Sequence, residues 1–147
     1  MSTAAVLFTG GKDSIYALHV AHKDGFDIRV LVSVIPLYRY SMIYHQPFFH
    51  GLVSQAQSLQ IPLETIGVYN QDEEVSALRF ILKKARDKYH VRTIISGAVK
   101  SLFQYKLFNK ISDELGLVHL APNWGLDEKS YMLNILNNGV EFIIISI

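Results

Sequence analysis

The fold of this chain is decided by residues 8–14, which read Phe8-Thr9-Gly10-Gly11-Lys12-Asp13-Ser14. A short apolar run, Ala4 to Phe8, precedes the two glycines, and an amphipathic run, Ile15 to His22, follows them. The pattern predicts a strand, a tight glycine turn and a helix. Such a turn exposes backbone N–H groups at the positive end of a helix dipole, which is equivalent to about +0.5 charge. The segment therefore predicts an anion-binding corner, and a phosphate group fits such a corner well.

The side chains around the glycine pair suit a phosphate ligand. The glycines let the backbone approach phosphate oxygens closely, and Lys12 adds a positive charge. The hydroxyls of Thr9 and Ser14 can donate hydrogen bonds. Asp13 would repel a phosphate by itself, but it fits if it holds a divalent metal ion on the phosphate oxygens.

Two common phosphate-binding motifs do not fit the spacing. The P-loop G-x-x-x-x-G-K-[ST] needs a glycine five positions before Gly11, where this chain has Val6. The dinucleotide pattern G-x-G-x-x-G is also absent, because Lys12 and Asp13 follow the glycine pair. An ordinary turn is the alternative interpretation of the doublet.

Composition narrows the class of protein. The 147 residues suit a single domain, and a content of 50% hydrophobic and 18% charged residues excludes a disordered chain. A net charge of +1 gives no electrostatic case for nucleic-acid binding. No apolar run approaches the roughly 20 residues that span a bilayer, and no secretory signal pattern opens the chain, so we expect a cytoplasmic protein without membrane contact. The absence of cysteine excludes disulfides and Cys-ligated metal sites.

Apolar and amphipathic runs alternate along the whole chain. The apolar runs predict five strands: Ala4–Phe8, Ile28–Ile35, Leu63–Ile66, Arg92–Ile95 and Glu141–Ile147. The runs with helical spacing predict five helices: Asp13–Lys23, His50–Leu59, Asp72–Tyr89, Ser101–Leu115 and Asp127–Asn137. Strands separated by helices predict an α/β fold, a three-layer sandwich around a mostly parallel sheet.

Ligands of such sheets bind at the carboxyl ends of strands, near a switch in strand order. The glycine pair follows the first predicted strand and Ser96-Gly97 follows another, so we expect the two to flank one crevice. The segment Pro36–Phe49 leaves the second strand without a clean period and is dense in aromatic residues. It suits either a wall or lid over a nucleotide or an irregular segment that buries its rings.

Residues 9–14 resemble the S-G-G-x-D-S signature of the PP-loop ATP pyrophosphatases, with Thr9 in place of the first Ser. Similarity to one family of that class, the diphthine–ammonia ligases, continues in order along the chain. That family has blocks reading Gly-Ala/Asp-Ile-x-Ser-x-Tyr-Gln and Leu-Gly-Leu…Ala-Pro-Leu-Trp-Gly. The matching segments are Tyr44-His45-Gln46-Pro47, Gln60-Ile61-Pro62-Leu63, Ser96 to Gln104, Leu115-Gly116-Leu117, Leu120-Ala121-Pro122 and Trp124-Gly125.

The resemblance implies a fold of the HUP type, residues 1–147 as a single ATP-binding domain, and a site for ATP and Mg2+. Lys12 and Asp13 would be catalytic, with Asp13 also holding the metal ion. The adenine would lie against the edge of the second strand near Val32–Val34. Nine residues would bind the nucleotide: Thr9, Gly10, Gly11, Lys12, Asp13, Ser14, Ser33, Gly97 and Gln104. Three would face the substrate: Tyr44, His45 and Trp124, of which Trp124 fits a core anchor equally well.

The chain also departs from the family pattern. Family members have Tyr-Gln, then Arg three residues after the Gln and Glu two beyond that, whereas this chain has Phe103-Gln104, Leu107 and Asn109. Gln46 stands in place of Thr, and Phe48 in place of Asn. Family members continue past the final strand into a Glu- and Gly-rich region that helps form the substrate site, and this chain ends at Ile147. These differences spare the ATP site and affect the substrate site.

The function implied by the resemblance is that of an ATP-dependent amide ligase. It would adenylate the carboxylate of diphthine on translation elongation factor 2 and amidate it with ammonia, releasing AMP and pyrophosphate. One alternative is a catalytically reduced ATP- or AMP-binding module of the same fold, favoured by Leu107, Asn109 and the early end. Another is a PP-loop tRNA-modifying enzyme, disfavoured by the missing cysteines and the near-neutral charge. The sequence leaves a homo-oligomer open.

Overall fold

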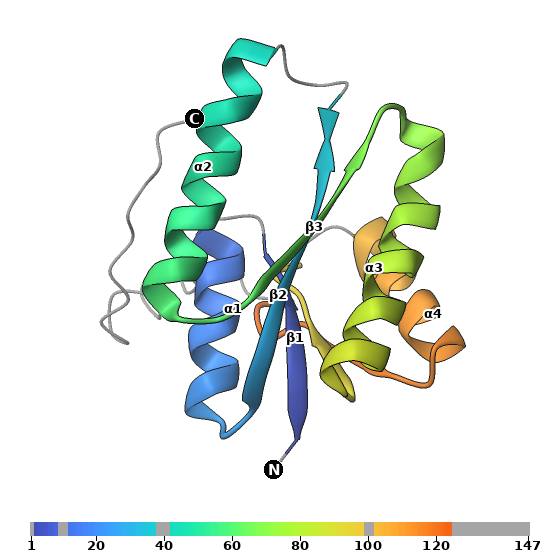
Figure 1. Ribbon diagram of the computed structural model, residues 1–147. Coiled ribbons are helices and arrows are strands. Elements are labelled where there is room, and N and C mark those ends of the chain that lie inside the picture. The colour runs from blue at the N-terminus through green and yellow to red at the C-terminus, as the bar shows by residue number, and fades with distance from the viewer. Residues whose placement is uncertain (1, 9–11, 38–41, 99–101, 125–147) are drawn as a thin grey trace.

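A five-stranded parallel sheet forms the centre of the molecule, and helices cover both of its faces (Figure 1). The computed structural model describes residues 2–8, 12–37, 42–98 and 102–124, with the backbone alone at residues 12 and 42–50. The strand order is β3-β2-β1-β4-β5, so the predicted α/β class is confirmed. In chain order the elements are β1 (Thr3–Leu7), α1 (Lys12–Lys23), β2 (Asp27–Pro36), α2 (Met42–Leu59), β3 (Leu63–Val68), a 3-10 turn (Gln71–Glu73), α3 (Glu74–Tyr89), β4 (Thr93–Ile95), α4 (Leu102–Glu114) and β5 (Val118–Leu120).

The strand β1 is buried on both faces, because its side chains alternate between two cores. Ala4 and Val6 belong to a core that α1 and α2 cover, and Ala5 belongs to a core that α3 and α4 cover. Figure 1 shows these two pairs of helices on opposite sides of the sheet. The helices close the first core with Ala17, Leu18, Ala21, Leu52 and Ala56, and the second with Leu78, Ile81, Leu82, Ala85 and Ile111.

The order of the strands switches at β1. The chain passes from β1 through β2 to β3 on one side, and then returns to place β4 and β5 on the other side. The strand β1 is therefore hydrogen-bonded to β2 and to β4, with Val6 in register with Leu31 and with Ile95. This arrangement makes the carboxyl ends of β1 and β4 neighbours, as the sequence predicted.

Helix α2 begins earlier than the sequence predicted. The predicted start was His50, because the aromatic-rich segment before it shows no clean period, and Pro47, which lacks an N–H, would remove one hydrogen bond from a helix that ran through it. In the structure the helix begins at Met42 and continues through Pro47. Its later turns bury Leu52 and Ala56 against the sheet, so tertiary packing outweighs the local cost of proline.

Short elements account for the other differences. The strand β5 was not predicted, because three residues are too few to show a period, and Val118 and Leu120 are exposed. The predicted helix over Asp72–Tyr89 divides into the 3-10 turn and α3. The predicted helix Asp127–Asn137 and strand Glu141–Ile147 lie outside the described residues.

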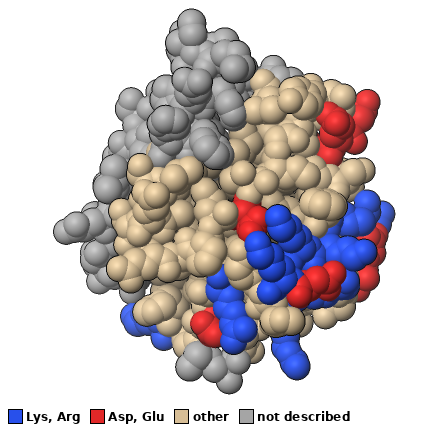
Figure 2. Space-filling view, in the orientation of Figure 1, with Lys and Arg blue, Asp and Glu red and all other residues tan. Residues whose placement is uncertain are grey.

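Charged side chains gather on the α3 side of the molecule, where both signs are interleaved (Figure 2). The cations there form ion pairs: Arg79 with Glu114, Arg86 with Asp87, and Lys84 and Lys88 with Glu64. These paired cations do not form a purely basic face.

Glu64 fastens the edge strand β3 to α3. Its carboxylate lies 2.8 Å from the Nζ of Lys84 and 3.0 Å from the Nζ of Lys88, and it accepts a 2.7 Å hydrogen bond from the hydroxyl of Tyr89. The hydrogen bonds from Lys84 and Tyr89 lower the pKa of Glu64 from 4.5 to about 2. Because the folded state holds this group ionised, its stabilisation is complete above pH 4.5 and is lost as the pH falls toward 2.

We predict that Glu64→Gln lowers the free energy of unfolding by about 1–2 kcal/mol at pH 7, because two ammonium groups and a hydroxyl lose their charged acceptor. Urea denaturation from pH 7 to pH 2.5 should show the difference from the wild type shrinking below pH 4.5. Glu114→Gln, which breaks one exposed pair, is the matched control and should cost less than about 1 kcal/mol. Equal losses in the two variants would contradict the role of Glu64.

Candidate functional site

The beginning of α1 lies directly against the residue that follows β4. A Cβ atom on Gly97 would lie 2.8 Å from the carbonyl carbon of Asp13 and 2.9 Å from the nitrogen of Ser14. Real Cβ atoms essentially never approach backbone atoms so closely. Only glycine fits at position 97, because any larger residue would place a Cβ atom against this peptide. The close approach joins the two segments that the sequence predicted to flank one crevice.

Asn123, which follows β5, contacts the Asp13–Ser14 peptide as well. This residue is 0% exposed, and its Nδ2 donates a 3.0 Å hydrogen bond to the carbonyl oxygen of Asp13. It follows β5 closely, so the main chain at Asp13 meets the ends of both strands on this side of the sheet. Asn123 belongs to none of the motifs found in the sequence. Its one signal was a polar residue in the otherwise apolar stretch Leu120 to Trp124.

The structure describes only some of the predicted phosphate-binding residues. Helix α1 begins at Lys12, and Asp13 lies in its first turn, where a carboxylate is favourable toward the helix dipole. Ser14 is 2% exposed. Residues 9–11 and the side chain of Lys12 lie outside the description, so their roles in binding phosphate stay predictions.

At the carboxyl ends of the strands, β2 extends past the end of β1. The nitrogen of Phe8 donates to the carbonyl oxygen of Val32 at 2.8 Å, and β2 continues to Pro36. Because peptide groups alternate in direction along a strand, those of Val34 face the side of β1, past its end. The strand β2 is internal, so the predicted edge is this overhang and not an edge of the sheet. Ser33 is 4% exposed and its backbone pairs with β3, so its predicted role in nucleotide binding stays a prediction.

The aromatic residues at this edge pack on one another. The ring of Trp124 stacks on Tyr105 of α4, with centroids 4.3 Å apart and planes 20° from parallel. The nitrogen of Trp124 donates to the carbonyl oxygen of Ala121 at 3.0 Å and closes a turn. These contacts fit the anchoring interpretation of Trp124. Gln104 precedes Tyr105 and is exposed.

His119 lies beneath α4 and joins three elements. Its Nδ1 is 2.6 Å from the Oδ1 of Asn109, and its Nε2 is 2.7 Å from the Oγ of Ser96. Because an amide oxygen can only accept, Nδ1 carries the hydrogen and Ser96 donates to Nε2. Burial lowers the pKa of His119 from 6.5 to about 4, so the ring is neutral at pH 7.

The order Ser96, His119, Asn109 is that of a serine, its base and an orienting group in nucleophilic catalysis. A nucleophile must be reached by its substrate, and Ser96 is 1% exposed. The hydrogen-bonded row therefore serves to hold β4, β5 and α4 together. Asn109 stands out in the sequence as a departure from the family pattern, but no local motif indicates that His119 is its partner.

Two predicted substrate residues and the predicted metal site remain to be placed. Tyr44 and His45 lie near the beginning of α2, and nothing is described of their side chains. Within the described residues no group of three or more His, Cys, Asp or Glu side chains could hold a metal ion. A Mg2+ ion on Asp13 would take its other ligands from phosphate oxygens and water, as Mg2+ commonly does.

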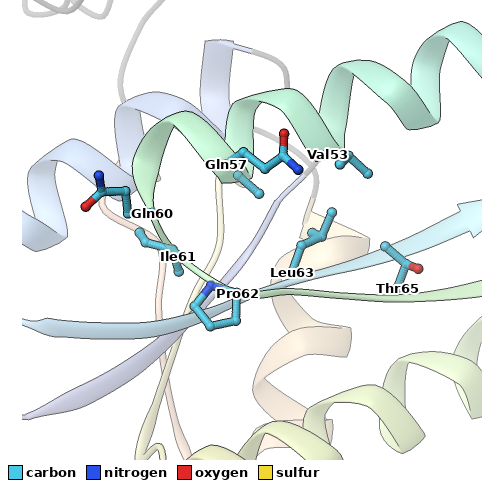
Figure 3. A pocket seen from close by; sticks show the side chains of 8 residues that line it. Val53, Gln57, Gln60, Ile61, Pro62, Leu63 and Thr65 are labelled. Atoms are coloured by element: carbon cyan, nitrogen blue, oxygen red, sulfur yellow. The ribbon is translucent and has the colours of Figure 1, made fainter.

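A separate groove of about 420 Å³ lies between α2 and the beginning of β3 (Figure 3). Its lining is apolar with two exposed amides, Gln57 and Gln60. It lies at the amino end of β3, so it is not part of the site at the carboxyl ends. None of the described helices has the length and apolar content that crossing a membrane requires.

The fold and the switch in strand order define a class, the α/β domains with a parallel sheet covered by helices on both faces. The structure is similar to that of the predicted subunit of a tRNA methyltransferase from Methanocaldococcus jannaschii, with a TM-score of 0.60 and 15% identity over 91% of this chain and 74% of that chain. It is also similar to the U34-tRNA thiolase NcsA from Methanococcus maripaludis, with a TM-score of 0.60 and 12% identity over 97% of this chain and 58% of that chain. At such identities the likeness shows the fold alone.

Residues 1–119 match the diphthamide synthase N-terminal domain, and the chain belongs to that family. The diphthine–ammonia ligase of Mus musculus is 26% identical over 166 aligned residues, and that of Homo sapiens is 25% identical over the same length. Each alignment covers 97% of this chain and 61% of the relative. The chain therefore spans about three fifths of the length of these relatives.

We predict that Gly97→Ala destabilises the fold by about 1–3 kcal/mol, because the methyl group meets backbone that cannot move aside easily. Thermal unfolding gives the size of the effect. Gly67→Ala is the control, since its Cβ would meet only the end of the Leu37 side chain, at 2.9 Å. A larger loss at position 67 than at position 97 would show that the contact with Asp13 is not tight.

The half-buried His119 leads us to predict that the free energy of unfolding decreases in acid. The folded pKa of about 4 lies below the unfolded value of 6.5, so the wild type loses stability as the pH falls through this window. His119→Gln should be less stable than the wild type at pH 8, and the difference should narrow toward pH 4. Urea titrations at each pH test this. The exposed His22→Gln is the control and should keep the wild-type pH dependence.

Proposed function

We propose that this chain is the nucleotide-binding part of an ATP-dependent ligase that forms an amide on a protein. Its substrates would be ATP, ammonia and the diphthine carboxylate of translation elongation factor 2. The observation that carries the proposal is the contact of Gly97 with the Asp13–Ser14 peptide, at the switch in strand order. Family membership supports the reaction, because the relatives that match are diphthine–ammonia ligases.

The chemistry explains why ATP is needed. A carboxylate does not react with ammonia at neutral pH, because its oxygen is a poor leaving group. Attack of the carboxylate oxygen on the α-phosphorus of ATP breaks the bond to the β-phosphate oxygen and releases pyrophosphate. Ammonia then attacks the carbonyl carbon, AMP leaves with the former carboxylate oxygen, and a proton is lost from nitrogen. The protein supplies position and charge stabilisation for both steps.

The residues at the beginning of α1 would act on the departing pyrophosphate. Backbone N–H groups of Gly10 and Gly11 and the ammonium of Lys12 would stabilise its charge. Asp13 would hold Mg2+ on the phosphate oxygens. The peptide groups of Val34, which face the space above β1, would contact the adenine.

A binding module without catalysis is the second candidate, and one observation favours it. Leu107 is packed against the core beneath α4, and Asn109 is bonded to His119. The family pattern has Arg and Glu at these two positions. Both positions thus serve the packing of this chain, and neither offers a charged group to a substrate.

One reaction mixture separates the two candidates. The chain would be incubated with Mg2+, ATP, ammonium and elongation factor 2 carrying diphthine. AMP and pyrophosphate in equal amounts, with an amidated factor, support the ligase. ATP binding without turnover supports the module. Formation of ADP would contradict cleavage between the α- and β-phosphates.

Substitutions at the beginning of α1 test the roles of its charges. Asp13→Asn and Lys12→Ala should each lower AMP formation by about 100-fold or more, because each removes a charge that the transition state needs. The controls are Asp24→Asn and Lys83→Ala, which change exposed charges outside the site. Wild-type rates in both site variants would remove the proposed roles.

A further inference from the structure

We propose that Asn123 is a positioning residue for Asp13, which sets the beginning of α1 for a metal-bound polyphosphate. The inference rests on the proposed function for its ligand and on the hydrogen bond described above for its geometry. The Nδ2 of Asn123 reaches the carbonyl oxygen of Asp13 at 3.0 Å across 110 positions of sequence.

The donor is held in place by its own surroundings. Asn123 lies in the turn that the nitrogen of Trp124 closes onto Ala121. Trp124 is stacked on Tyr105, and Tyr105 also lies 5.6 Å from the ring of His119. The amide is therefore carried by a turn that is packed on α4, and it transmits the position of α4 to the main chain at Asp13.

The acceptor is held from the opposite direction as well. Gly97 lies so near the Asp13–Ser14 peptide that a Cβ atom at position 97 would clash with it, which leaves the peptide little room toward β4. The amide of Asn123 limits movement away from β5. Between the two, the carbonyl of Asp13 is fixed, and its side chain starts from a fixed Cα.

The effect of such a contact would fall on the phosphates more than on the adenine. Asp13 is proposed to hold the metal ion on the phosphate oxygens, whereas the adenine would lie near Val34 on another strand. A contact that only stabilises the fold would weaken binding of all nucleotides alike. A positioning contact would weaken Mg2+-bound ATP selectively and spare AMP.

The related family pattern indicates the substitution to make. Its Ala-Pro-Leu-Trp-Gly block has Leu where this chain has Asn123, and Leu has the same branching and number of side-chain heavy atoms without a donor. In Asn123→Leu we expect the Kd for Mg2+-ATP to rise about tenfold and that for AMP to change by less than about twofold, measured by calorimetry. Tyr105→Leu should move the same ratio in the same direction by about threefold. Gln57→Ala, an exposed amide in the groove at the amino end of β3, is the control and should leave the ratio unchanged.

Hydrogen exchange without nucleotide gives a second, independent measurement. The amides of Ala17 and Leu18 donate to the carbonyls of Asp13 and Ser14 within α1. In Asn123→Leu their exchange should accelerate at least threefold, with little change at the end of α1. Equal losses for AMP and ATP, or unchanged exchange, would overturn the inference. If the wild type binds no ATP, the proposed function fails, and the exchange rates alone then decide whether Asn123 holds Asp13.

Discussion

The site depends on the close approach of Gly97 to the peptide between Asp13 and Ser14. Everything around it follows from bringing the end of β4 against the beginning of α1. The parallel pairing of β1 with β4 sets the two chain segments side by side, and the absence of a side chain at position 97 lets them touch. The positive end of the α1 dipole then points into the space above both strands, where a phosphate would be stabilised.

Much of the fold was readable from the sequence, because burial on both faces leaves near-continuous apolar strands. The runs that became β1 and β2 are of this kind, and the helices α1 and α4 end where Gly25 and Gly116 adopt φ values of +92° and +72°. The structure differed where the local signal was weak or misleading. The aromatic-rich segment before His50 has no clean period and so concealed the first turns of α2, and three residues of β5 were too few to show a pattern.

The sequence predicted the site residues that belong to local motifs, but it did not predict the contacts between distant segments. The glycine pair, Lys12, Asp13 and Gly97 belong to motifs whose spacing carries the chemistry. The partners of those residues come from segments whose sequence has no motif. Asn123 acts through a turn held by ring stacking, and His119 through hydrogen bonds to two different elements. Such contacts depend on how β5 and α4 pack, which no local pattern encodes.

The stacked ring pair at the end of β5 has an optical consequence. Trp124 is the one tryptophan of the chain, and it is adjacent to the residue that touches Asp13. Indole emission responds to small changes in the electric field and in water contact around the ring. The unlabelled protein therefore carries a fluorescent reporter next to the residue that contacts Asp13, and a ligand that bound beside Asp13 would be expected to change its emission.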